Sequence, residues 1–246
     1  MGVIDPAALA EKLRPPRPLQ RLGDALVAPP LPGSTTAWIA ACPIDARSIE
    51  ACVAWAWSTG ASRVAYGGPP GNYLVSGCDV DDLERLDALA RAGFVEHGRH
   101  VDLEVRTDVA SVVNSRVLRT PASSVDAVIA FTRAQFGEGW AFEADRAASH
   151  GGLFHAVDGD GRIVGVAAHS GNLAHRGTFG PVGVVDAARG GGLGRALSSC
   201  VFADLHARGF ATATVPWVEE ATVPFYASFV RVLQRTERIS LRRSRQ

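Results

Sequence analysis

Residues 184–197 read VVDAARGGGLGRAL, and this stretch decides the fold that we expect. The residues of 179–185 predict a strand, and apolar residues at helical spacing predict a helix over about 192–208. Four glycines lie in the connection. Glycine lets the main chain approach a ligand closely, and the free N–H groups at a helix N-terminus bind phosphate. The stretch therefore predicts a site for a ligand that carries a pyrophosphate.

The spacing of the glycines narrows the choice of ligand. A dinucleotide-binding turn requires G-x-G-x-x-G and an acidic residue about 20 positions later. Here Gly192 and Gly194 are followed by Leu197 in place of the third glycine, and no suitable acid ends the next strand. A Walker loop requires G-K-S/T, which the chain lacks. The pattern present is R-x-x-G-x-G, which begins at Arg189.

Residues 180–197 resemble the acetyl-CoA-binding strand, turn and helix of the GNAT N-acetyltransferase superfamily. Phe225 and Tyr226, about 30 residues later, resemble the helix that presents a tyrosine in that family. The resemblance covers about residues 110–246. It implies an α/β (α+β) fold, in which a mixed, mostly antiparallel and twisted sheet is flanked by helices.

The order strand, helix, glycine, strand, loop, helix, strand occurs at about 37–105 and again at about 180–243, which indicates an internal repeat. The first half is similar to the C-terminal part of a GNAT domain in tandem members. We therefore expect a degenerate, partial GNAT-like domain over 1–107 and a complete acetyltransferase domain over 108–246. Residues 45–48 replace the glycine-rich turn in the first half, so we expect no CoA site there and a structural or substrate-shaping role instead.

The resemblance also implies roles for individual residues. Main-chain amides of 190–195 would hold the pyrophosphate of acetyl-CoA, the co-substrate, and the strand before the turn would pair with its pantetheine arm. Tyr226 would donate a proton to the departing thiolate; the alternative is a buried aromatic residue that only packs. The expected cofactor-binding residues are Val182, Gly183, Val184, Arg189, Gly190, Gly191, Gly192, Leu193, Gly194 and Arg195.

Direct transfer to an amine requires a group that takes the proton of the amine. The entering strand carries no carboxylate, although many relatives have one there, so the candidates are Glu219, Glu220 and His169. We select Glu219, which replaces a frequent asparagine of the family; a surface charge is the alternative for both glutamates, and a satisfied histidine is the alternative for His169. Trp140 falls where such enzymes build the acceptor pocket, or else it packs between helices.

Composition limits the function classes. The formal net charge of the 246 residues is zero, which argues against a nucleic-acid partner, and the late run of arginines is read as a solvated strand edge and tail. No apolar run approaches the roughly 20 residues of a membrane helix, and the N-terminus has no signal-peptide core. Four scattered cysteines are read as reduced core residues, and no metal site is expected. We expect a cytoplasmic monomer or homodimer that binds no membrane.

The leading interpretation is an acetyl-CoA-dependent N-acetyltransferase that moves the acetyl group directly to a small-molecule or peptide amine. No cysteine has the setting of a nucleophile, so no covalent intermediate is expected. Two alternatives belong to other classes. One is a catalytically silent CoA-binding sensor or scaffold, and the other is a nucleotide-binding module.

Overall fold

The computed structural model describes residues 5–13, 18–69, 71–110, 112 and 114–245, and the chain divides into two compact units. Unit 1 extends to Asp102 and resumes at Thr236; unit 2 is Leu103–Arg235. The last residues of the chain belong to unit 1, because the final strand pairs there with two other strands. The division into domains over 1–107 and 108–246 stays a prediction.

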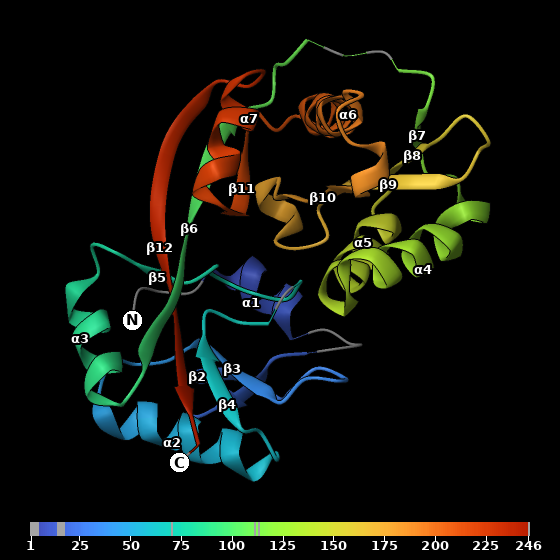
Figure 1. The fold of residues 1–246 in the computed structure, drawn as a ribbon. Helices are drawn as coiled ribbons and strands as arrows, with labels where there is room; N and C mark the ends of the chain where they lie inside the picture. Colours follow the sequence, from blue (N-terminus) through green and yellow to red (C-terminus); the bar gives the residue numbers. More distant parts are fainter. Residues whose placement is uncertain (1–4, 14–17, 70, 111, 113, 246) are drawn as a thin grey trace. The chain divides into compact units, whose positions relative to one another are not determined.

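Unit 1 is a mixed sheet with helices packed on it (Figure 1). The strand order is β1-β2-β3-β4-β12-β6, with β5 paired to β12. β3 pairs with β4 in parallel, whereas the pairs β1 with β2, β2 with β3, β4 with β12 and β5 with β12 are antiparallel. Its elements, two of which continue into unit 2, are α1 (Pro6–Lys12), β1 (Gln20–Leu22), β2 (Ala25–Ala28), β3 (Thr36–Ala41), α2 (Ala46–Ser58), β4 (Arg63–Tyr66), β5 (Cys78–Asp79), α3 (Leu83–Arg91), β6 (Val95–Arg106) and β12 (Val232–Ser244).

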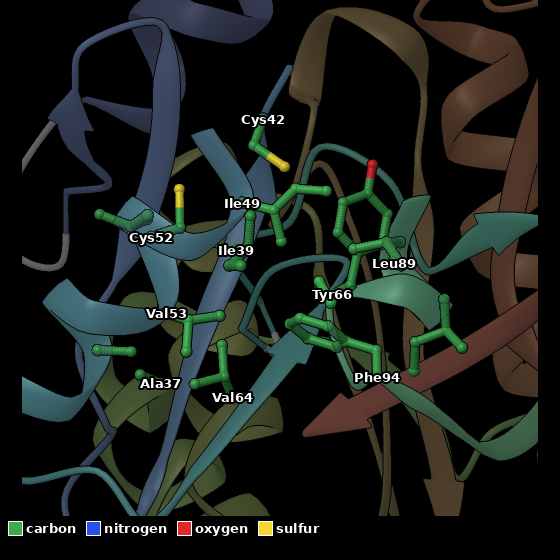
Figure 2. Packing of buried hydrophobic residues seen from close by; sticks show 14 of the residues in the cluster. Ala37, Ile39, Cys42, Ile49, Cys52, Val53, Val64, Tyr66, Leu89 and Phe94 are labelled. Carbon is green, nitrogen blue, oxygen red and sulfur yellow. The ribbon is translucent and has the colours of Figure 1, made fainter. Parts of the chain in front are cut away.

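The core of unit 1 lies between α2 and the sheet. Helix α2 begins where the Asp45 carboxylate accepts a hydrogen bond from Ser48 N–H at 2.9 Å, and it is followed by Gly60 with φ +83°. Its inner stripe at i, i+3, i+4 and i+7 is buried, as Figure 2 shows for Ile49, Cys52 and Val53 against the strands. The core residues labelled in Figure 2 are Ala37, Ile39, Cys42, Ile49, Cys52, Val53, Val64, Tyr66, Leu89 and Phe94.

Unit 2 contains an antiparallel sheet of order β10-β9-β8-β7. Helices α4 and α5 cover one face and α6 covers the other (Figure 1). Val166 and Ala168 of β9 join the core under α4 and α5, whereas Gly165 lies against Leu197 of α6. The helices and strands are β7 (Val117–Arg119), α4 (Val125–Phe136), α5 (Glu138–Ser149), β8 (Leu153–Val157), β9 (Ile163–His169), β10 (Phe179–Val184), α6 (Leu193–Ala207), β11 (Thr212–Val218) and α7 (Val223–Ala227).

The α/β class with a mostly antiparallel sheet is confirmed. The final strand, β12, begins at Val232, because pairing with other strands extends a segment rich in charge. β7 is short, with three residues at Val117–Arg119; residues 111 and 113 lie outside the described part. The element order β3-α2-β4-α3-β6 in the first half is similar to β10-α6-β11-α7-β12 in the second. The internal repeat, with a partial copy over 1–107, stays a prediction.

Candidate functional site

The glycine-rich turn projects from unit 2 between β10 and α6. Gly190 and Gly192 have φ values of +82° and +75°, a region that residues with a Cβ rarely adopt. A methyl group at either position would meet no atom within 4 Å, so the space beside the turn is open. Residues 189–192 are exposed, and Leu193, the first residue of α6, is buried. The buried Leu193 thus anchors the turn to unit 2, while residues 189–192 are exposed to solvent.

The backbone N–H groups of this turn remain available. The first hydrogen bond of α6 runs from Ala196 N–H to Gly192 O at 3.0 Å. Within the described ranges, no group accepts a hydrogen bond from the N–H groups of residues 190–195. Six donors therefore lie at the positive end of the α6 dipole, and no atom lies within 4 Å of the place of a methyl group on Gly190 or Gly192. This arrangement fits a pyrophosphate, which offers several anionic acceptors.

Strand β10 has an open edge next to the turn. Its residues Val182, Gly183 and Val184 pair with β9 on one side. On the other side, Thr178, which precedes β10, forms one isolated parallel bridge with Thr214 of β11, and β10 is the last strand in its sheet order. Among the described residues no further bridge joins the two strands, so the outer edge of β10 has no partner strand at 182–184, although the Val184 carbonyl accepts a hydrogen bond from Arg189 Nε.

Unit 1 lacks both features at the corresponding place. Strands β3 and β4 stay paired in parallel over four residue pairs, from Thr36 with Arg63 to Ile39 with Tyr66. The N-terminus of α2 carries the Asp45 carboxylate, whose pKa is lowered by hydrogen bonds from the Ser48 N–H. A negative side chain at this position repels a phosphate. The expected absence of a CoA site from the first half is therefore consistent with its geometry.

Comparison with solved structures identifies this architecture. A GCN5-related glucosamine N-acetyltransferase region of a fungal multi-domain β-N-acetylglucosaminidase has a TM-score of 0.71 at 16% identity, over 89% of this chain and 31% of that one. A GCN5-related N-acetyltransferase from Kribbella flavida gives 0.60 at 16% identity, over 98% and 94%. A tandem GNAT protein from the clavulanic acid biosynthesis pathway gives 0.56 at 14%, over 89% and 78%. The fold is that of the GCN5-related N-acetyltransferases.

Sequence comparison adds nothing to this assignment, because no family model and no curated protein matches the chain. The chain spans less than a third of the fungal protein. In the part of the chain that is described, no helix is long and apolar enough to cross a membrane. Among the same residues, no group of three or more His, Cys, Asp or Glu side chains is placed to hold a metal ion.

The arginines around the glycine-rich turn have different roles. Arg189 folds back: its Nε donates to Val184 O at 3.1 Å and its guanidinium pairs with Asp186 at 3.0 Å, so it braces the turn. Arg195 is exposed, and its guanidinium lies 5.6 Å from the ring centroid of Phe229. Arg116 was not among the expected residues, although its Nη2 lies 3.7 Å from the place of a methyl group on Gly191. No local pattern marks Arg116, since it precedes β7.

Tyr226 lies beside the start of strand β10. Its ring packs edge-on against Phe179 at 5.9 Å and against Phe225 at 5.1 Å, and 5% of the residue is exposed. Phe225 in turn is 3.8 Å from the place of a methyl group on Gly194, so α7 lies against the first turn of α6. Burial raises the pKa of Tyr226 well above its ordinary value. The hydroxyl therefore keeps its proton at neutral pH, as a proton donor must. The burial and ring contacts also fit the alternative, in which Tyr226 is an aromatic residue that only packs.

The candidates for the base lie apart from this cluster. Glu219 is exposed before α7, and its carbonyl accepts a hydrogen bond from Thr222 N–H at 2.8 Å. Glu220 forms an ion pair with Arg235 at 2.6 Å and is exposed, which fits the alternative that it is a surface charge. Within the described ranges, no hydrogen bond or ion pair joins the Glu219 side chain to the other expected site residues, so its role stays a prediction.

His169 is a structural residue of the core. It is fully buried, with Nδ1 2.9 Å from Ser170 Oγ and Nε2 2.7 Å from the Asp204 carboxylate. A carboxylate only accepts, so Nε2 carries a proton. Burial lowers the pKa of His169, so the ring is neutral near pH 7. The alternative of a satisfied histidine is therefore confirmed, and His169 is unavailable as the base.

Proposed function

We propose that unit 2 binds acetyl-CoA and transfers its acetyl group directly to the amine of a small-molecule or peptide acceptor. One observation carries the proposal: an uncapped turn of six free amides lies at the end of a strand whose outer edge is open. A pyrophosphate and an extended arm on one molecule match these two features together. CoA has both parts, whereas a nucleotide cofactor without the arm uses only the turn.

In this proposal, the amides of 190–195 bind the pyrophosphate, and the main chain of 182–184 aligns the arm. Acetyl-CoA supplies the activated acyl thioester. Tyr226 donates its proton to the sulfur that leaves, and Glu219 takes the proton of the attacking amine, directly or through water. The acetyl–sulfur bond breaks as the acetyl–nitrogen bond forms, so the charge balances without a metal or an oxidant. The amino sugar named for the fungal relative is one acceptor of this class.

Calorimetry and a thiol assay test the function. Titration with CoA should give one site per chain, because Asp45 and the closed β3–β4 pair leave no second site in unit 1. Acetyl-CoA with a panel of amines should release free thiol. One-site binding without thiol release across the panel would favour the sensor. A ligand at a hundredfold excess over its Kd raises the free energy of unfolding by about 2.7 kcal/mol. A gain of this size with ATP or NAD, and none with CoA, would favour the nucleotide-binding module.

Tyr226→Phe should separate binding from turnover. The variant keeps the ring that packs against Phe179 and removes only the hydroxyl, so the Kd for CoA should change less than about twofold, while loss of a general acid costs about a hundredfold in kcat. Steady-state kinetics and calorimetry on the same preparation measure both quantities. Turnover equal to that of the unmodified chain would remove Tyr226 from the mechanism and leave it a packing residue.

A further inference from the structure

Gly183 lies in contact with two aromatic rings. A methyl group on Gly183 would be 2.9 Å from Cζ of Phe136 and 2.9 Å from Cζ3 of Trp140, so the rings leave room for glycine alone. The ring centroids are 5.0 Å apart and the planes are inclined at 33°. Both residues are half-buried, so part of each stays accessible. The middle of the open strand is therefore bordered by ring carbon.

The break between α4 and α5 assembles this pair. Phe136 ends α4, Gly137 follows with φ +92°, and α5 begins at Glu138. A residue without a Cβ is needed at that backbone conformation. Phe136 and Trp140 thus reach the same point of β10 from two helices. Phe131 packs edge-on against Phe136 at 5.9 Å and supports it.

The pair lies on the face of β10 opposite α6. Successive residues of a strand point to opposite faces. Val184 faces α6, since its Cγ2 is 4.0 Å from the place of a methyl group on Gly194. Gly183 faces α4 and α5, as its contacts with the two rings show. The open edge thus has the turn and α6 on one face and the aromatic pair on the other.

We propose that Phe136 and Trp140 set the length of the acyl group that this site accepts. The inference rests on the proposed function, in which the thioester end of the ligand lies along residues 182–184. An acyl group that extends from the open edge beside Gly183 meets the packed ring carbon of Phe136 and Trp140 instead of solvent. An acetyl group adds one methyl carbon beyond the carbonyl, whereas a butanoyl group adds three and must displace a ring. The two rings thus select short acyl donors.

Calorimetry of the full chain with CoA, acetyl-CoA, butanoyl-CoA and octanoyl-CoA tests the inference without turnover. We expect CoA and acetyl-CoA to bind with Kd values within about threefold of each other, and the two longer donors to bind about tenfold more weakly or worse, as overpacking predicts. Trp140→Ala should bring butanoyl-CoA to within about threefold of acetyl-CoA and leave the Kd of CoA unchanged. Trp140→Leu, which keeps an apolar contact, should shift the same ratio in the same direction if the alanine variant fails to fold.

Phe131→Leu is the matched control, because it alters the same aromatic cluster behind Phe136 and is not among the nearest neighbours of Gly183. It should keep the discrimination of the unmodified chain. Equal Kd values for all acyl donors in the unmodified chain would overturn the inference and leave the proposed function intact. An unchanged ratio in both Trp140 variants would also overturn it. Failure of CoA itself to bind would overturn the proposed function and the inference together.

Discussion

Gly192→Asp is expected to abolish measurable CoA binding. The residue is the N-cap of α6, exposed and with open space beside it, so a carboxylate fits there without a clash. The variant would place a carboxylate at the N-cap of α6, the position that Asp45 has in α2, although the backbone is left-handed at 192 and extended at 45. Two unit charges about 4 Å apart repel by about 4 kcal/mol at an effective dielectric constant of about 20, which corresponds to a loss of several hundredfold in affinity. Calorimetry with CoA measures the loss.

Gly192→Asn is the control that isolates the charge. Asn and Asp have the same shape, tolerate a positive φ about equally and cap helices about equally well. The two variants should therefore unfold at similar temperatures. We expect Gly192→Asn to bind CoA less than about tenfold more weakly than the unmodified chain, since it lacks the repulsion. If the Asp variant keeps the CoA affinity of the Asn variant, the phosphate groups do not lie at this turn.

The turn was predictable because every signal for it is local. Glycines at two left-handed positions, a strand before and a helical spacing after lie within 20 residues of Gly192. The alternation of polar and apolar residues is less informative for β12. Residues 232–238 are rich in charge, so the sequence does not indicate that they form the first half of this strand, which its pairing with other strands produces. The place of this strand in unit 1 was likewise hidden, because its partners β4 and β5 come from the far end of the chain.

The residues around the site were harder to predict from the sequence than the glycine-rich turn at its centre. Arg116 reaches the turn only because β7 pairs with β8 beside it, and nothing in residues 114–118 indicates a ligand. The contact of Phe136 and Trp140 with Gly183 also requires the packing of α4 and α5 on the sheet. Helical spacing predicts that such rings face inward, but it does not predict which strand residue they touch.

Asp204→Ala is expected to cost unit 2 about 2–4 kcal/mol of unfolding free energy, the largest stability effect among the side-chain networks of this unit. The Asp204 side chain is 11% exposed and accepts hydrogen bonds from His169, Arg119 and Arg208. Without it, the N–H of the fully buried His169 has lost its acceptor and water does not replace it. The network joins the end of β9 to the C-terminal half of α6, so its loss loosens the helix that carries the turn.

Urea unfolding at pH 8 measures this cost cleanly. Burial lowers the pKa of His169, so the stability gained by keeping it neutral is complete above its ordinary value of 6.5 and is lost as the pH falls below it. At pH 8 the ring is neutral in both states, so the comparison reports the hydrogen bonds and ion pairs lost with Asp204 and no change in His169 protonation. Asp204→Asn keeps an acceptor and should lose roughly half as much.

Asp186→Ala supplies the second control. Its carboxylate pairs with Arg189 at 3.0 Å but is 90% exposed, so removing it should change the unfolding free energy by less than about 0.5 kcal/mol. A comparable loss in both alanine variants would mean that burial does not decide the value of these ion pairs. A loss below about 0.5 kcal/mol for Asp204→Ala would show that α6 is held by its apolar face alone, through contacts such as the stack of Phe202 on Phe179 at 4.6 Å.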